Sequence, residues 1–149
     1  MNEQPATGAL YTKRTHAALR IIGKDVDPAE VSYIFGVQPT RARLVEVEAA
    51  SVNLSFWSLS SEGHIDSSSL EEHIDWVLRQ IELRLVKLEG YLNQVNAYAD
   101  VFCFWESAVG HGGPTLSANL LGRLAGYNLH LTLDIYFRDE AHEEVLDPN

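Results

Sequence analysis

Residues 70–90 read L-E-E-H-I-D-W-V-L-R-Q-I-E-L-R-L-V-K-L-E-G and hold the clearest periodic pattern of the chain. On a helical wheel of about 100° per residue, seven apolar residues of this stretch fall within an arc of about 80°. They are Leu70, Ile74, Val77, Leu78, Ile81, Leu85 and Leu88. A stripe of this width predicts one amphipathic helix that reaches nearly to Gly90 and turns the stripe toward the core.

The opposite face of this helix carries Trp76, Leu83 and Val86 beside Arg79. A purely solvated helix face does not need three large apolar side chains. These residues predict either an interface with a partner, with a polar rim around an apolar centre, or packing beneath the N-terminal or C-terminal segment of the chain. The helical wheel does not separate these two interpretations.

Two capping boxes compete for the start of this helix, because Ser68 with Glu71 and Ser69 with Glu72 both fit the spacing of that motif. A shorter helix of about two turns is predicted to begin at Asp27–Glu30. This run supplies an N-cap aspartate, a proline at the first helical position and a glutamate at the third.

The rest of the chain predicts five strands and a third helix. Residues 99–105 are apolar on both faces, which is typical of a central strand. Apolar and polar residues alternate in 129–137, which predicts a strand with one buried face. The other expected elements are a strand at 15–23, a strand with Leu44, Val45 and Val47, a bend at Ala49–Asn53, a strand with Leu54, Phe56, Trp57 and Leu59, and a helix from Ser117 to Gly126.

The predicted order is strand, helix, strand, strand, helix, strand, helix, strand. Its first six elements match a split β-α-β-β-α-β, or ferredoxin-like, unit, in which an antiparallel-rich sheet packs its helices on one face. We therefore expect an α+β fold of this kind, extended by a C-terminal α-β unit. Residues 1–14 are expected to form a flexible leader, residues 15–137 a single α+β domain, and residues 138–149 an acidic tail.

The composition excludes several functional classes. The 149 residues include 11 Lys+Arg and 21 Asp+Glu, a formal net charge of −10, which argues against a nucleic-acid partner. Hydrophobic residues make up 46% and charged residues 21%, as in ordinary soluble domains. Because no apolar run approaches the roughly 18 residues of a membrane span, no membrane partner is expected either.

Cys103 is the only cysteine of the chain. One cysteine forms no internal disulfide and no multi-cysteine metal site, and it fits a reducing cytoplasm. In a predicted buried strand, Cys103 is expected to pack rather than to act as a nucleophile. We therefore expect a cytoplasmic protein. A chain of this length can bury a core without a metal or another cofactor, so no cofactor is expected.

Several segments in one order along the chain carry a family resemblance. They are Asp27-Pro28-Ala29-Glu30, Phe35-Gly36-Val37-Gln38-Pro39-Thr40, Trp57-Ser58-Leu59-Ser60-Ser61, Leu70-Glu71-Glu72-His73, Phe102-Cys103-Phe104-Trp105, Gly112-Gly113-Pro114-Thr115-Leu116-Ser117 and Asp134-Ile135-Tyr136-Phe137. Together they resemble an uncharacterised, mainly bacterial family of domains of unknown function, number forty-two seventy-nine. The chain departs from the family pattern between Thr40 and Trp57, where Leu44–Ala50 replaces an expected basic, glycine-containing segment. The resemblance implies fold boundaries and no activity.

A glycine-rich loop, Gly110–Pro114, lies between a predicted strand and the predicted N-cap Ser117. Free N–H groups and the helix dipole favour an anion at such a place. The loop lacks the Lys-Ser/Thr ending of a P-loop and the spaced glycines of a dinucleotide fingerprint. It predicts either a structural turn or a ligand-facing loop in which His111, Gly112 and Gly113 contact a phosphate or carboxylate.

The last two strands and the loop between them gather groups suited to acid–base chemistry or metal binding. These are Glu106, His111, His130, Asp134 and Tyr136. A His–carboxylate pair could act as a general acid–base system, and three converging ligands could hold a metal. No local HxH or HExxH motif is present, and a solvated sheet face predicts the same residues, so no catalytic or metal-binding residue is assigned.

Aromatic side chains concentrate in the predicted sheet. They are Trp57, Phe102, Phe104, Trp105 and Tyr136. Their simplest interpretation is core packing. The alternative is a pocket wall near the glycine loop, with Arg20 or His111 as the polar anchor.

Two functional hypotheses follow from these patterns. The first is a non-enzymatic protein-interaction module that binds a basic protein partner or a second copy of itself, an immunity-type inhibitor of a basic toxin being one form. The alternative is a small anionic-ligand-binding protein or enzyme. Its site would lie at the loop Gly110–Ser117 and on the polar face of the last strand.

Overall fold

A five-stranded mixed sheet organises the chain, for which the computed structural model describes residues 9–45 and 54–137. The strand order is β2-β3-β1-β4-β5. Neighbouring strands pair antiparallel except β4 and β5, which are parallel. The strands are β1 (Thr12–Gly23), β2 (Arg41–Arg43), β3 (Ser55–Ser60), β4 (Tyr98–Ser107) and β5 (His130–Phe137). The α+β class is thereby confirmed.

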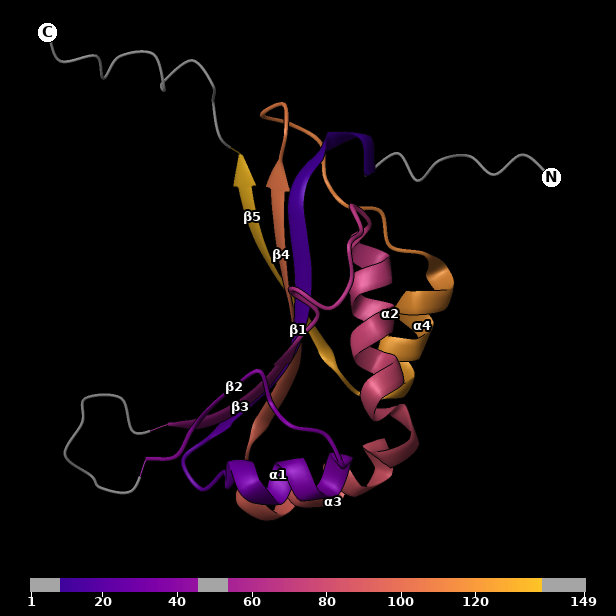
Figure 1. Ribbon diagram of the computed structural model, residues 1–149. Coiled ribbons are helices and arrows are strands. Elements are labelled where there is room, and N and C mark those ends of the chain that lie inside the picture. Colours follow the sequence, from indigo (N-terminus) through magenta and orange to yellow (C-terminus); the bar gives the residue numbers. More distant parts are fainter. Residues whose placement is uncertain (1–8, 46–53, 138–149) are drawn as a thin grey trace, which may run out of the picture.

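The helices pack on one side of the sheet (Figure 1). Among the described residues they are α1 (Pro28–Phe35), α2 (Leu70–Ile81), α3 (Leu85–Val95) and α4 (Ala118–Gly126), with short 3-10 helices η1 (Ala9–Tyr11) and η2 (Glu82–Arg84). Figure 1 shows α2 and α4 beside the strands β1, β4 and β5, and α1 and α3 near one end of the sheet. The other side of the sheet carries no helix among the described residues.

Successive side chains of β1 point alternately to the two sides of the sheet. Ala17, Leu19 and Ile21 are fully buried in the core that the helices cover. The residues between them face the other side, which we call the open face. The strand begins at Thr12, three residues before its predicted start at Thr15, and therefore adds Arg14 to the open face.

The predicted helix over 70–90 is wrong in its continuity and right in its buried stripe. All seven stripe residues are buried. The chain leaves the helical path at Ile81, where φ is −125°, passes through η2 and starts again as α3 in a different direction (Figure 1). Continued straight, the second half would run past the end of the sheet, whereas the bend lets Leu85 and Leu88 join the same core. Tertiary packing overrides a helical propensity that no proline or glycine interrupts.

Helix α3 also runs past its predicted end near Gly90. It continues to Val95 and ends at Asn96, which adopts the left-handed conformation with φ 48°. Asparagine tolerates this conformation better than most residues do, so it can cap a helix where glycine is the usual choice. Residues 91–95, which lie beyond the predicted end of the helix, are therefore helical.

The predicted hairpin within 41–60 is shifted in its first strand. Strand β2 comprises only Arg41–Arg43, so Leu44 and Val45 lie after it. Val47 and the predicted bend at Ala49–Asn53 lie outside the described residues. Leu44 is exposed, and the exposed Arg41 and Arg43 take the strand positions at the edge of the sheet.

The predicted helix starts agree with the structure. Asp27 accepts a hydrogen bond from Ala29 N at 2.9 Å at the start of α1, and Ser69, rather than Ser68, accepts one from Glu72 N at the start of α2. Ser117 caps α4 by accepting from Leu120 N at 3.1 Å.

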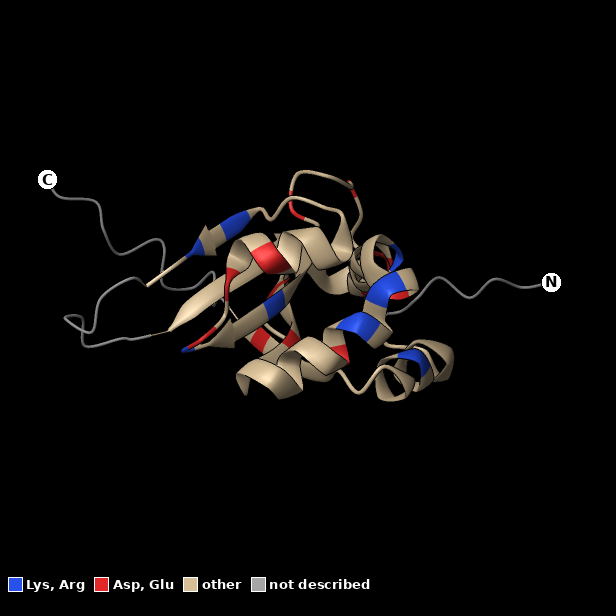
Figure 2. Ribbon diagram, turned by 90° about the horizontal axis from the view of Figure 1, so that it is seen from below, with Lys and Arg blue, Asp and Glu red and all other residues tan. Residues whose placement is uncertain are grey.

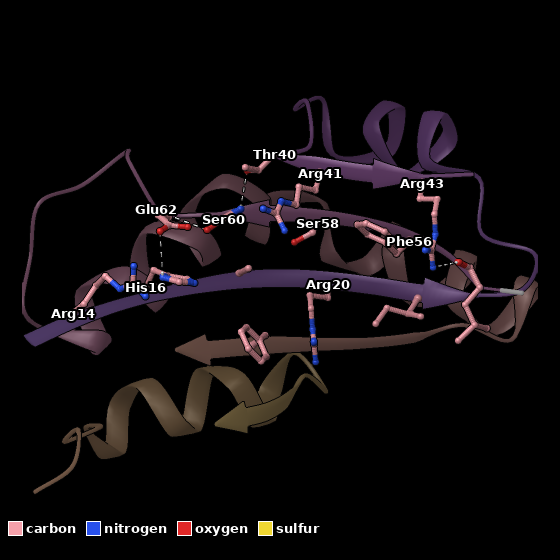
Figure 3. A pocket seen from close by; sticks show the side chains of 14 residues that line it. Arg14, His16, Arg20, Thr40, Arg41, Arg43, Phe56, Ser58, Ser60 and Glu62 are labelled. Atoms are coloured by element: carbon pink, nitrogen blue, oxygen red, sulfur yellow. Dashed lines mark hydrogen bonds and ion pairs between the residues drawn. The ribbon is translucent and has the colours of Figure 1, made fainter. Parts of the chain in front are cut away.

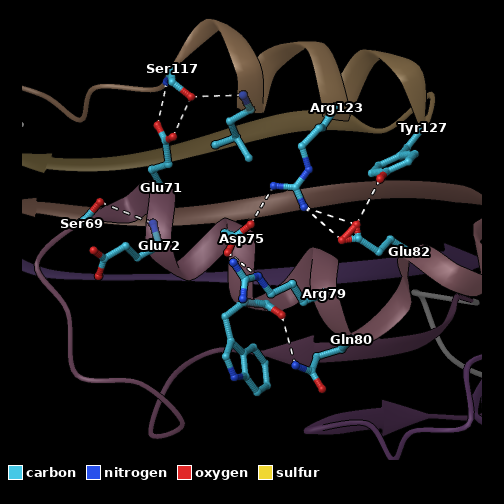
Figure 4. Close-up of polar contacts among 12 residues, drawn as sticks. Ser69, Glu71, Glu72, Asp75, Arg79, Gln80, Glu82, Ser117, Arg123 and Tyr127 are labelled. Atoms are coloured by element: carbon cyan, nitrogen blue, oxygen red, sulfur yellow. Dashed lines mark hydrogen bonds and ion pairs between the residues drawn. The ribbon is translucent and has the colours of Figure 1, made fainter.

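Helices α2 and α4 are joined by an arginine clamp (Figure 4). Arg123 lies between Asp75, at 2.7 Å, and Glu82, at 3.2 Å, and Tyr127 also donates to Glu82 at 3.2 Å. The hydrogen bond with Asp75 is the main cause that raises the pKa of Arg123, so this guanidinium stays charged. The clamp fixes α4 against α2.

The alternation in 129–137 predicts a completely covered face for the last strand, and this prediction is wrong for its second half. Leu131 packs against the core, whereas Leu133, Ile135 and Phe137 are 46%, 36% and 55% exposed. Strand β5 is an edge strand, and its second half extends beyond α4 (Figure 1). Strand β4, expected to be central, does lie between two neighbours, although the middle strand of the five is β1.

Candidate functional site: an arginine-lined cleft on the open face

A cleft of about 610 Å³ lies on the open face of the sheet (Figure 3). Strands β1, β2 and β3 form most of it. The residues that line it are Arg14, His16, Ala18, Arg20, Ile22, Thr40, Arg41, Arg43, Leu54, Phe56, Ser58, Ser60, Glu62 and Phe102. Its volume is within the usual range of small-molecule sites.

Small side chains create the hollow. Ala18 on β1 pairs with Ser60 on β3, and the next pair on the same face joins Arg20 with Ser58. Three short side chains on adjacent strands therefore leave room that larger side chains would fill. Arg41 on β2 pairs with Ser58 and forms part of the wall beyond it.

The wall of the cleft is basic although the chain is acidic. Four of the 11 Lys and Arg residues line it: Arg14, Arg20, Arg41 and Arg43. In Figure 3, Arg41 and Arg43 project from β2 over β3, and Figure 2 shows the basic positions of β2 at the edge of the sheet. Arg41 forms no hydrogen bond or ion pair with a described residue, so its guanidinium donors are open to a ligand.

Phenylalanine rings support three of the guanidinium groups. Arg20 lies over Phe102 at 4.4 Å from the ring centroid. Arg14 lies over Phe104 at 4.7 Å and Arg43 over Phe56 at 5.3 Å. Stacking on an aromatic face holds the planar guanidinium while its edge N–H groups remain able to donate.

Arg20 is tied to a buried carboxylate. Its Nε and Nη2 donate to Asp100 at 2.8 and 2.5 Å, and the Thr132 hydroxyl donates to the same carboxylate at 2.6 Å. The hydrogen bond to Asp100 is the main cause that raises the pKa of Arg20. Arg20 therefore fixes the floor of the cleft and shares its charge with Asp100, whereas Arg41 and Arg43 supply the positive charge of the β2 wall.

His16 and Glu62 lie at the end of the cleft away from Arg43 (Figure 3). His16 Nδ1 is 4.0 Å from Glu62 Oε1, and the imidazole stacks on Phe104 with ring centroids 5.0 Å apart. Burial lowers the pKa of His16 below its usual 6.5, against the opposing effect of Glu62. His16 is therefore mainly neutral at pH 7.

The structure places the predicted ligand residues in four separate regions, one of which is the glycine loop. Arg20 lines the cleft. Glu106, Asp134 and Tyr136 occupy open-face positions of β4 and β5, where Glu106 pairs with Tyr136 in register, but none of the three lines the cleft. The side chain of Trp57 lies on the helix side.

Trp57 belongs to the core. It is fully buried, its indole N–H donates to the Ser32 hydroxyl at 2.9 Å, and its ring lies 5.4 Å from that of Phe35. These contacts join β3 to α1. Of the two interpretations of this tryptophan, core packing is the one that its position matches.

The glycine loop packs as a turn. Gly112 has φ 96°, and a Cβ at this position would lie 3.1 Å from Tyr11 Cβ, so the turn requires glycine. The His111 ring lies 5.3 Å from that of Tyr11, and the His111 carbonyl accepts a hydrogen bond from Ser107 at 2.7 Å. Gly113 follows in the same loop, and neither His111 nor the two glycines line the cleft.

The start of α4, where an anion was expected, already holds one from the chain itself. The Glu71 carboxylate accepts from Ser117 N at 2.7 Å and from the Ser117 hydroxyl at 2.6 Å (Figure 4). A carboxylate at a helix N-terminus is favoured by the free N–H groups and the dipole. The electrostatic preference of this loop is thus met within the fold.

The predicted interface residues do not form one uniform patch. Trp76 is half-buried and stacks on His64 at 4.8 Å, so the loop before α2 covers part of it. Arg79 pairs with Asp75 at 2.7 Å. Leu83 and Val86 are 97% and 87% exposed, at η2 and the start of α3.

No group of three His, Cys, Asp or Glu side chains in residues 9–45 and 54–137 is placed to hold a metal ion. No helix within them has the length and apolar character needed to cross a membrane. Cys103 is buried, and burial raises the pKa of its thiol to about 12, so it is not a thiolate at pH 7.

Most of the cleft could not be assigned from the sequence. The missed residues that carry its polar chemistry are Arg14, His16, Arg41, Arg43 and Glu62. A signal was present in β1, where Arg14, His16 and Arg20 recur on one face of the strand. The predicted start at Thr15 left Arg14 out of that pattern.

A comparison with known proteins gives the family of the chain. No curated protein and no solved structure matches it. A family model matches residues 13–138, which run from the start of β1 to just past the end of β5. The resemblance seen in the sequence is confirmed, and the chain belongs to the family described as Domain of unknown function (DUF4279).

Proposed function

We propose that this protein binds a small anionic ligand in the cleft on the open face. The observation that carries the proposal is the set of four arginines around one cavity of a protein whose net charge is −10. Arginine presents planar, rigid donors that match the oxygen atoms of carboxylates and phosphates. A local cluster of positive charge raises the concentration of anions at the cleft even when the whole molecule repels them.

The contacts within the cleft favour binding at its β2 wall. The guanidinium of Arg41 has no partner among the described residues, and that of Arg43 donates one hydrogen bond to the Leu54 carbonyl and pairs with no carboxylate among them. Ser58 lies between Arg41 and Arg20 in the sheet, so its hydroxyl can add a neutral hydrogen bond. An oxyanion over Ser58 would therefore meet one hydroxyl and two cationic side chains that form no ion pair with a described residue.

Replacing Arg41 and Arg43 together by glutamine is expected to weaken anion binding about a hundredfold, since each charged hydrogen bond contributes about 1.5–3 kcal/mol. The anions would be chosen by thermal shift from inorganic phosphate, citrate and alkyl carboxylates, and the dissociation constant measured by titration calorimetry. Both arginines are exposed on a short edge strand, so the fold should survive their replacement.

A control for the change in total charge is the double variant R79Q/R84Q. Arg79 and Arg84 are exposed and lie outside the cleft. This variant should bind as the parent protein does. Equal affinities of R41Q/R43Q and the parent protein, or no binding of any anion to the parent protein, would contradict the proposal.

A second candidate function is association with a second copy of the chain through Leu83 and Val86. The supporting observation is their exposure of 97% and 87% on neighbouring turns, because side chains of this size are normally covered. Replacement L83D is expected to change an associated species into the 16.6 kDa monomer in sedimentation velocity. A parent protein that sediments as a monomer, or an L83D variant that sediments like its associated parent, would contradict this candidate.

We also propose that the unit from β1 to β4 is ferredoxin-like. The antiparallel pairing of β1 with both β3 and β4 supports this topology. A cytoplasmic location is proposed because the single cysteine is a buried, unpaired thiol.

A further inference from the structure

A ring nitrogen of His16 and a carboxylate oxygen of Glu62 face each other at one end of the cleft. His16 Nδ1 is buried and has no hydrogen-bond partner among the described residues. Glu62 Oε1 lies 4.0 Å away, and the side chain of Glu62 is 60% exposed. Because 4.0 Å is too long for a direct hydrogen bond, a donor group that displaces the exposed Glu62 side chain slightly could contact both atoms (Figure 3).

The surroundings keep this pair in place. The imidazole of His16 is stacked almost parallel to Phe104, with 10° between the ring planes. The backbone N–H of Glu62 donates to the Ser60 hydroxyl at 3.1 Å, which ties the start of the loop to the cleft floor. Burial lowers the pKa of His16, so its ring is mainly neutral at pH 7 and one ring nitrogen can accept a hydrogen bond.

We infer that the ligand of the cleft is zwitterionic, with an ammonium group between His16 and Glu62 and an anionic group at Arg41 and Arg43. The inference rests on the proposed function and names the class of ligand. An ammonium group has three N–H donors and can donate both to the Glu62 carboxylate and, in the tautomer that carries its proton on Nε2, to His16 Nδ1, whereas a hydroxyl has one donor and can satisfy only one of them. The Glu62 carboxylate also attracts the positive charge of the ammonium group. The nearby Arg14 guanidinium would repel that charge, but it lies 3.9 Å from the Glu106 carboxylate, which partly compensates it.

The spacing of the two ends sets the length of the ligand. His16 and Arg20 are four residues apart on β1, about 13 Å along the strand at about 3.3 Å per residue. Arg20 is level with Ser58, and Ser58 with Arg41, across the sheet. A chain shorter than this span, running over Ala18 and Ser60, would connect the ammonium group to the anionic group.

The test uses three probes of one chain length: ω-aminooctanoate, ω-hydroxyoctanoate and octanoate. The parent protein is expected to bind the amino probe about tenfold more tightly than either of the others, because only that probe adds a charged hydrogen-bond donor. In E62Q this preference should fall to about twofold or less. The affinity for octanoate should stay within about twofold of the parent value, because its carboxylate meets the distant arginines.

Two further variants separate the possible failures. H16F keeps a ring on Phe104 and removes the acceptor, so it should lower the preference for the amino probe without changing octanoate binding. E89Q removes one exposed carboxylate from α3 and should leave the preference intact. R41Q/R43Q should weaken the binding of all three probes equally.

Each result decides between the two proposals. A parent protein that binds the three probes equally, or an E62Q variant that keeps the full preference, overturns the zwitterionic ligand and leaves anion binding standing. Probe affinities that do not change in R41Q/R43Q overturn the anion site itself. A parent protein that binds none of the probes overturns the inference.

Discussion

Replacement R20M is expected to lower the free energy of unfolding by about 3–5 kcal/mol, the usual effect of removing one partner of a buried ion pair. Asp100 has no exposed side-chain surface and depends on Arg20 for two hydrogen bonds. Without the guanidinium, the carboxylate would keep only the Thr132 hydroxyl and would be charged in a poorly solvated place. Urea denaturation of the purified variants measures the loss.

The double variant R20M/D100N separates the ion pair from the packing of Arg20. Asparagine removes the stranded charge and keeps an oxygen for the Thr132 hydroxyl, so the double variant should recover most of the stability. R41Q, which removes an exposed arginine of the same cleft, should change the free energy of unfolding by less than about 0.5 kcal/mol. An R20M variant as stable as R41Q would show that the pair is not a structural element of the sheet.

The sequence identifies Arg20 as a candidate polar anchor, but it does not show that Arg20 forms an ion pair with Asp100. Arg20 is the only charged residue within 15–23, which makes it conspicuous. Its partner Asp100 is 80 positions away and is followed in its strand by the apolar run Val101–Trp105. Strand pairing across the centre of the sheet brings them together, and no local pattern specifies that pairing.

The helical stripe shows how a sequence pattern can identify buried residues and still miss the path of the chain. Periodicity depends on which face each residue presents, and α2 and α3 each keep the same apolar side toward the core. The bend at η2 depends on the shape of the surface that the two helices must cover. That shape results from the twist of a sheet whose strands come from the whole chain.

One of the two sequence interpretations of the glycine loop had an anion at the start of α4, and in the structure a carboxylate of the chain itself lies there. Ser117 was identifiable as a cap, and its free N–H groups do attract a carboxylate. Glu71 supplies that carboxylate from the first turn of α2, 46 positions away. The cleft on the open face could not be predicted in this way, because its arginines belong to two separate strands, β1 and β2, that only the sheet aligns.

Replacement W57A is expected to lower the free energy of unfolding by about 3–5 kcal/mol, as is typical when a large aromatic residue is removed from a core. Trp57 is among the largest fully buried side chains and contacts both Ser32 and Phe35 on α1. Its removal would leave a cavity between β3 and α1 that neighbouring side chains cannot fill without moving. Thermal and urea unfolding measure this loss.

The variant W57F tests on which side of the sheet Trp57 acts. Phenylalanine keeps an aromatic ring against Phe35 and loses the hydrogen bond to Ser32, so a smaller loss of about 1–2 kcal/mol is expected. Its neighbours in the chain, Phe56 and Ser58, line the cleft, whereas the Trp57 side chain points to the opposite side of β3. Anion affinity should therefore be the same in W57F and in the parent protein. A folded W57F variant whose anion affinity is tenfold weaker would make Trp57 part of a ligand site, because a change confined to the helix side has no direct contact with an anion held on the open face.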